Sequence, residues 1–192
     1  MRTKLFTLLL MFATSIGSIY SSVKINSLYY NLDTVNNTAE VTYQKRYASD
    51  NYSSLTTVNI PKSVKYNGVT YSVTAIGEGA FYSCTNLISI NISNSVNTIW
   101  DGAFQKCGIT SIQIPDNIVY VGNAAFNECY GLANPIYNTH VFAFMPRSYN
   151  GTYTIPDGIE MIAGYAFSGC SNLTSVEIPN SVVAIGDAAF TS

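Results

Sequence analysis

The sequence predicts a β-rich solenoid with short helical turns, and three features of the 192-residue chain support this fold class. An Ala-Phe pair recurs at Ala80-Phe81, Ala103-Phe104, Ala125-Phe126, Ala166-Phe167 and Ala189-Phe190. Successive phenylalanines of these pairs lie 23, 22, 41 and 23 positions apart. The copies also carry aliphatic residues spaced L-x-x-I-x-I, as at Leu87, Ile90 and Ile92. A period in the low twenties with this spacing is typical of a leucine-rich-repeat solenoid with about 22–23 residues per rung.

The copy at residues 76–96 indicates how one rung is built. Its phenylalanine, its cysteine and the aliphatic residues of its strand are expected in the core. Glu78 and the equivalent Asp101, Asn123 and Asp187 are expected to cap a short helical turn that carries Ala-Phe, because side-chain oxygens there accept from unpaired backbone N–H groups. A proline ends most of the strands, where a missing N–H no longer breaks the ladder.

The first 22 residues have the layout of a secretory signal peptide. Arg2 and Lys4 precede an almost wholly apolar stretch at 5–16, and small residues follow, with cleavage expected after Gly17 or a few residues later. A bilayer span needs about 20 apolar residues, so the stretch is too short for an anchor. We therefore expect a secreted or cell-surface protein with no membrane span after cleavage.

Residues 23–54 precede the regular repeats and are expected to form an N-terminal β cap. The runs at 25–30 and 39–43 suit two strands, and Asn36-Asn37 between them is a turn signal. A solenoid needs its first rung covered, because each rung buries its faces only against neighbours. A hairpin here would provide that cover.

The repeats occupy residues 55–192, and two places depart from the pattern. Asn67-Gly68 predicts a small hairpin that projects from the first rung, since both central residues of a type I′ turn need positive φ. The step of 41 residues equals one rung of 23 plus 18, which fits either a short rung or a bulged loop. The apolar segment 141–144 favours the short rung. The chain stops within a repeat, so the solenoid is expected to be C-terminally incomplete.

With these motifs, residues 55–192 resemble the BspA-like leucine-rich-repeat proteins, a bacterial surface family. The resemblance rests on the recurrence of A-F-x-x-C-x-x-L-x-x-I-x-I-P in register. It implies a secreted or surface location and a non-enzymatic role in adhesion. The partner that it implies is an extracellular, host or matrix protein.

Alternation along each strand predicts a candidate binding face. Residues between the buried aliphatics point outward, and stacking aligns them in two columns. The first column is Thr57, Ser89, Ser111, Thr152 and Ser175, and the second is Asn59, Asn91, Gln113, Thr154 and Glu177. We call these ten residues the strand face. They form a nearly uncharged surface of hydroxyl and amide groups that suits protein binding, or alternatively a glycan.

Aromatic residues of the irregular rung are a secondary candidate, because aromatics are enriched at interfaces. They are Tyr137, Phe142, Phe144 and Tyr149. A third class of function, a hydrolase, would depend on His140, the single histidine. No nucleophile elbow, Walker A or G-x-G-x-x-G motif accompanies it.

Charge and cysteine content argue against several other classes. Charged residues make up 10% of the chain, against about 25% in typical soluble domains. Without Arg2 and Lys4 the balance is 9 − 2 = 7 basic against 11 acidic residues, so a nucleic-acid partner is not expected. Cys84, Cys107, Cys129 and Cys170 stand at one repeat position and can be buried thiols or form a bridge between adjacent rungs. Their spacing lacks a zinc motif, and no metal or cofactor is expected.

Overall fold

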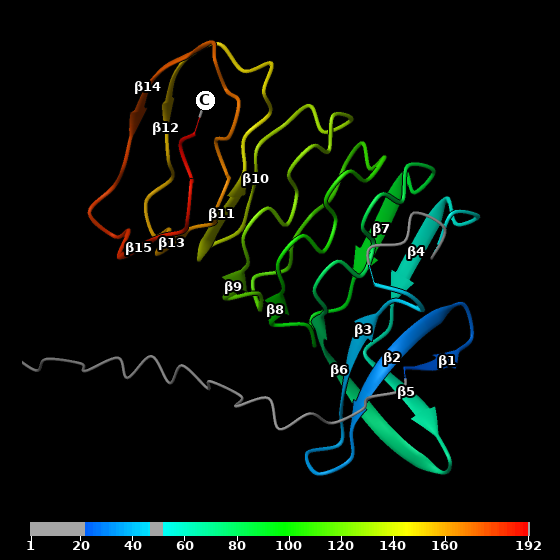
Figure 1. The fold of residues 1–192 in the computed structure, drawn as a ribbon. Helices are drawn as coiled ribbons and strands as arrows, with labels where there is room; N and C mark the ends of the chain where they lie inside the picture. The colour runs from blue at the N-terminus through cyan, green and yellow to red at the C-terminus, as the bar shows by residue number, and fades with distance from the viewer. Residues whose placement is uncertain (1–21, 47–51, 192) are drawn as a thin grey trace, which may run out of the picture.

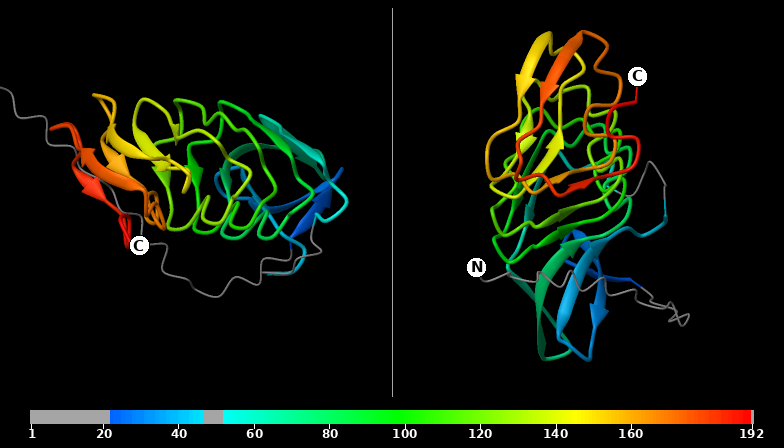
Figure 2. Two further views of the ribbon diagram at one scale, coloured as in Figure 1. Left: turned by 90° about the horizontal axis from the view of Figure 1, so that it is seen from above. Right: turned by 90° about the vertical axis from the view of Figure 1, so that its left-hand side faces the viewer.

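The computed structural model describes residues 22–46 and 52–191, which form fifteen strands and no helix. The strands belong to a stack of rungs that runs from the N-terminal meander to the C-terminal rungs (Figure 1). Seen from above, the rungs lie side by side along one axis (Figure 2). The predicted signal peptide, residues 1–22, lies outside the described residues but for Ser22.

An antiparallel meander leads into the stack. It consists of β1 (Val23–Ile25), β2 (Leu28–Asp33) and β3 (Thr38–Thr42). The hairpin of β2 and β3 falls on the two runs that were predicted to be strands. β3 then pairs in parallel with β6 (Val69–Ile76), so the meander and the rungs share one sheet. The predicted projecting hairpin is confirmed: β5 (Ser63–Tyr66) pairs with β6 around Asn67-Gly68, whose φ values are 47° and 84°.

One parallel ladder follows the Ile-Gly side of the rungs. β6 pairs with β8 (Thr98–Ile99), and β8 with β9 (Tyr120–Val121). The ladder resumes with β11 (Val141–Phe144), β13 (Met161–Ile162) and β15 (Ala184–Ile185). β10 (Ile136–Tyr137) forms an antiparallel hairpin with β11. Because β11 pairs in parallel with β13, the irregular segment is a short rung within the stack, as the apolar segment suggested.

A second ladder follows the strand face and is interrupted. β4 (Thr57–Ile60) pairs in parallel with β7 (Ser89–Ile92), and β12 (Gly151–Thr154) with β14 (Leu173–Glu177). Between these pairs, residues 109–114 repeat the aliphatic spacing of a strand but form only a single bridge, from Ser89 to Ser111. The ladder therefore consists of two separate two-stranded sheets.

The Ala-Phe segments form successive tight turns, and the predicted helical turns are not present. In residues 79–84 the backbone N–H groups donate alternately to the next rung and within their own turn. Those of Gly79, Phe81 and Ser83 donate to carbonyls of the next rung, and those of Ala80, Tyr82 and Cys84 donate three residues back. A helix needs every N–H directed back along its own axis. The stack takes half of these donors sideways, so no helix forms.

The predicted helix caps are also replaced by other contacts. The Asp101 carboxylate accepts from the backbone N–H of Asn123 in the next rung, at 2.8 Å. Glu78 forms an ion pair with Arg46. These side chains therefore tie rungs or neighbouring segments together and do not end helices.

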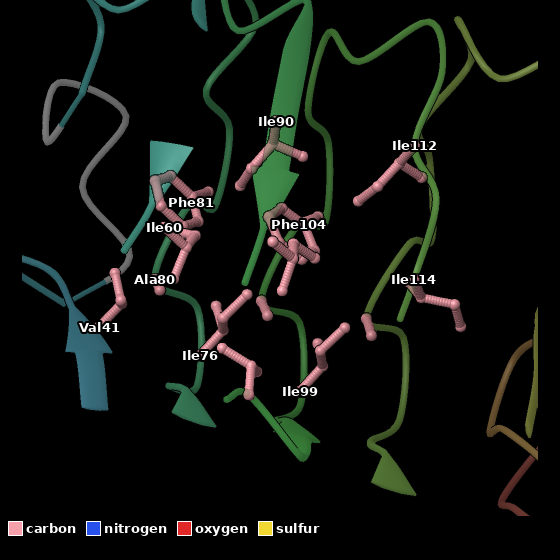
Figure 3. Packing of buried hydrophobic residues seen from close by; sticks show 14 of the residues in the cluster. Val41, Ile60, Ile76, Ala80, Phe81, Ile90, Ile99, Phe104, Ile112 and Ile114 are labelled. Carbon is pink, nitrogen blue, oxygen red and sulfur yellow. The ribbon is translucent and has the colours of Figure 1, made fainter. Parts of the chain in front are cut away.

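The phenylalanines stack face to face through the core. Phe81 and Phe104 have centroids 5.4 Å apart with an interplanar angle of 2°, and Phe104 and Phe126 are 5.3 Å apart. Tyr52 covers the first ring at 5.0 Å and is itself fixed by hydrogen bonds to Tyr29 and Thr42. Figure 3 shows Phe81 and Phe104 among isoleucines that point inward from the rungs, such as Ile76, Ile90 and Ile99.

The short rung divides the core into two clusters. The Phe81 column belongs to the first cluster, and a second column of Phe142, Phe167 and Phe190 belongs to the C-terminal part. Where the short rung lacks an Ala-Phe turn, the flanking rungs bond directly, through the Ala124 N–H and the Gly164 carbonyl.

Two polar side chains fasten the short rung. Asn138 is buried and makes four hydrogen bonds. Its amide donates to the carbonyls of Pro115 and Ile118, and its oxygen accepts from the N–H groups of His140 and Val141, all at 2.7–2.9 Å. Arg147 donates to Asn127 and to the Ser168 carbonyl on opposite sides.

Candidate functional site

All ten residues of the strand face are exposed. They alternate with buried aliphatics, as in β4, where Val58 and Ile60 are buried and Thr57 and Asn59 are not. The strand pairing places Thr57 opposite Ser89, Asn59 opposite Asn91, Thr152 opposite Ser175 and Thr154 opposite Glu177. Alternation therefore placed each of these side chains on the outside.

The two columns are not continuous. The structure brings Thr57, Asn59, Ser89, Asn91, Ser111 and Gln113 together in the N-terminal part of the stack. It places Thr152, Thr154, Ser175 and Glu177 in a separate pair of strands beyond the short rung. The Thr154 hydroxyl donates to the Glu177 carboxylate at 2.8 Å, so part of the second group is already paired within the protein.

A hollow of about 680 Å³ opens where the strand pairing lapses. Its lining comes from three segments: residues 91–94, 110–116 and 132–138. It joins three residues of the strand face, Asn91, Ser111 and Gln113, with Tyr137 of the secondary candidate. Asp116 is the one charged residue of this lining, and it accepts from the hydroxyl and N–H of Thr139.

The secondary candidate is corrected by burial. Phe142 is fully buried and Phe144 is 7% exposed, because both fill the core of the short rung. Tyr137 is 45% exposed and lies over Phe142 with an interplanar angle of 7°. Tyr149 is half-buried, and its hydroxyl donates to the Thr152 carbonyl. Of the four predicted aromatics, Tyr137 alone borders the hollow.

All four cysteines are buried and form no disulfide. The thiols of Cys107 and Cys129 donate to the carbonyls of Phe81 and Phe104 in the preceding rungs, at 3.0 and 2.9 Å. Burial raises the pKa of Cys129 to about 12 and raises that of Cys170 as well. The position serves packing and rung-to-rung bonding in this structure.

Thiol titration checks this arrangement. All four thiols are buried, and burial raises the pKa of Cys129 and Cys170, so native protein should react slowly with a disulfide reagent. Unfolding in guanidinium without reductant should release four free thiols per chain. A count of two would mean that a bridge joins adjacent rungs in the isolated protein.

His140 lies between β10 and β11 with a 40% exposed side chain. Its Nδ1 is 3.9 Å from a carboxylate oxygen of Glu160, a residue twenty positions away in the sequence. Glu160 comes close because β11 and β13 are neighbours in the ladder. The contact is that of an exposed ion pair when the ring is protonated.

Sequence reasoning missed Trp100, the single tryptophan of the chain. It is 41% exposed and occupies the position where three other rungs carry Gly77, Gly122 and Gly186 and a fourth carries Ala163. That departure from the repeat was visible in the sequence. The hollows beside it were not, because they involve residues of the meander.

Residues 22–46 and 52–191 contain neither a candidate metal centre nor a candidate membrane-spanning helix. No cluster of three or more histidine, cysteine or acidic side chains is arranged to hold a metal there. The same residues contain no helix long and apolar enough to cross a membrane.

Comparison with known proteins identifies the repeats. The family model of the BspA type leucine rich repeat region matches residues 68–152 and 139–192, with six copies. Among solved structures, a leucine-rich repeat protein from Bacteroides capillosus is 26% identical with a TM-score of 0.54, over 83% of this chain and 99% of that one. The comparison with curated proteins finds no match.

A second solved structure supports the fold alone. The leucine-rich repeat protein of T. pallidum is 19% identical with a TM-score of 0.56, over 85% of each chain. The family model covers more than half of the sequence, and its two matched segments overlap in the short rung. The chain therefore belongs to the BspA-type leucine-rich-repeat family.

Proposed function

We propose that this protein is a secreted or cell-surface, non-enzymatic binding module that adheres to another extracellular protein through its strand face. The observation that carries the proposal is the hollow of about 680 Å³, which unites Asn91, Ser111, Gln113 and Tyr137. Membership in a repeat family supports it, since extended faces of such stacks commonly bind proteins. The apolar stretch at 5–16 supports export of the chain.

The lining indicates what kind of partner surface would fit. Amide and hydroxyl side chains offer both donors and acceptors, so they suit a partner with polar, uncharged groups. Tyr137 at the border adds an exposed aromatic ring, the residue type that is enriched at protein interfaces. We place the contact in the N-terminal part of the strand face, because Thr154 and Glu177 beyond the short rung are already bonded to each other.

The N-terminal meander has a supporting role in this proposal. We propose that residues 23–54 cap the stack, with Tyr52 closing the column of phenylalanine rings at 5.0 Å from Phe81. Tyr52 is 3% exposed, and its hydroxyl donates to the Thr42 carbonyl and accepts from the Tyr29 N–H. The cap would hold β4 and β7, and with them the strand face, in register.

Two arginines introduced into the hollow test the proposal. Asn91→Arg combined with Gln113→Arg places two long cations where the lining is uncharged, so binding of the secreted protein to immobilised matrix and cell-surface proteins should fall at least about tenfold. The matched control is Asn150→Arg with Asn180→Arg, two exposed asparagines that do not line the hollow.

Both variants should unfold at the same temperature as the parent protein, since all four positions are exposed. Undiminished binding by the Asn91 and Gln113 variant would place the contact elsewhere. Equal losses in both variants would indicate a nonspecific effect of added positive charge.

A further inference from the structure

Trp100 departs from the repeat in a way that core packing does not explain. Three other rungs carry glycine at this position and a fourth carries Ala163. Space is short at Gly122, where a Cβ would lie 2.2 Å from the Asp101 carboxylate and 2.6 Å from its backbone nitrogen. The rung at 99–104 instead carries the largest side chain there, and 41% of Trp100 is exposed. An exposed indole leaves apolar surface in water that a ligand packed on the ring would cover.

Neighbouring residues fix the orientation of the indole. Tyr120, on the following rung, has its ring centroid 5.5 Å away at an interplanar angle of 57°. On its other side, Trp100 lines both neighbouring hollows together with Glu40 of β3. The indole therefore has a fixed position between the meander and the rungs.

Two hollows flank the Trp100 side chain. One, of about 310 Å³, is lined on its far side by Thr42, Tyr43, Glu78 and Asp101. The other, of about 400 Å³, extends along Asp33, Thr38, Asn97 and Thr98. Asn31, Glu40 and Trp100 belong to both, so the two hollows form one groove with the indole between them.

The polar groups of the groove argue against an anionic ligand. No lysine or arginine is among the described residues that line either hollow. Three carboxylates of the lining have a donor within the protein: Asn31 for Glu40, Arg46 for Glu78, and the Asn123 N–H for Asp101. Arg46 neutralises Glu78, whereas Glu40 and Asp101 accept from uncharged N–H groups. A carboxylate has about four lone-pair sites, so each keeps room to accept from hydroxyl groups.

We propose that this groove binds a neutral oligosaccharide of at least two sugar units, which lies across the indole of Trp100. The apolar face of a sugar ring packs on the indole, and its hydroxyls donate to Glu40, Glu78 and Asp101 and accept from Asn31. Two hollows of several hundred cubic ångströms on either side of one aromatic wall suit adjacent units of a chain. This site is separate from the strand face and does not depend on the function proposed for it.

The single tryptophan makes the test direct. The protein is first applied to an array of neutral oligosaccharides. Those retained are titrated while tryptophan emission is followed with excitation beyond the tyrosine absorption band, so that the signal reports on Trp100. We expect saturable binding with a change in emission. Trp100→Gly, which installs the residue of three other rungs, should lower binding in a label-based assay at least about tenfold.

A second variant distinguishes loss of saccharide binding from misfolding of the Trp100→Gly variant. Glu40→Gln keeps the volume of the side chain and the fluorophore, removes the charge, and should weaken the same saccharide several-fold. Tyr137→Ala, on the strand face, should leave saccharide binding unchanged. Thermal unfolding of each variant establishes that it is folded.

Three results would overturn the proposal. No retained saccharide on the array is the first. The second is saccharide binding that survives in both Trp100→Gly and Glu40→Gln. The third is binding of a lysine-rich peptide, but of no saccharide, in a manner that depends on Trp100, since this would assign the groove to a cation.

Discussion

Replacing Phe104 by alanine should lower the free energy of unfolding by about 3 to 5 kcal/mol. The ring is fully buried and lies between two others, with centroids 5.4 Å from Phe81 and 5.3 Å from Phe126. Its removal leaves a cavity in the middle of the column that neighbouring rungs cannot close, because their backbones are bonded to one another on both sides. Urea denaturation followed by circular dichroism measures the change.

Phe190→Ala provides the matched comparison for this prediction. Phe190 is 44% exposed and stacks on one ring, that of Phe167 at 4.8 Å. Its loss should cost about 1 kcal/mol, in line with partial burial and a single aromatic contact. If the two substitutions were equally costly, the stacked column would not be the centre of stability.

Replacing Asn138 by alanine should also be strongly destabilising, by about 3 to 5 kcal/mol. The substitution removes four hydrogen bonds of 2.7–2.9 Å at once. It leaves the N–H of Val141 and the carbonyl of Ile118, both on buried residues, without a partner. Thermal and urea unfolding of the protein would measure the loss.

Two variants sharpen the interpretation of Asn138. Asn117→Ala, at an exposed position nearby, should change stability by less than about 0.5 kcal/mol. Asn138→Asp keeps the acceptors for His140 and Val141 but sets a carboxylate oxygen against two carbonyls, so it should be nearly as harmful as alanine. A stable aspartate variant would mean that the amide donors contribute little.

Repetition made some features predictable from the sequence. Residues such as Ile90 and Ile92 alternate with Ser89 and Asn91, and strand geometry then decides which side each one faces. The recurring phenylalanine, three residues before cysteine, indicated an inward position, which Phe81, Phe104, Phe126 and Phe167 occupy. Asn67-Gly68 carried its own turn chemistry, so its hairpin did not depend on distant residues.

Features that depend on contacts between rungs could not be predicted in the same way. Asp101 looked like a helix cap because its partner, the Asn123 N–H, lies in the next rung. Phe142 and Phe144 looked available for binding, because the sequence does not reveal that the short rung turns both into the core. Trp100 stood out against three glycines and an alanine, but its groove requires Asn31 and Glu40 of the meander.

The short rung also has a consequence for how the molecule opens. In a stack, each rung contacts only its neighbours, so stability is close to a sum of rung terms and interface terms. Here the two hydrophobic clusters meet at residues 141–145, and Asn138 and Arg147 provide polar links across that interface. Such a boundary separates cooperative units, which open with different free energies. Amide hydrogen exchange would then fall into two classes, with the C-terminal rungs exchanging first and the rungs around Phe104 last.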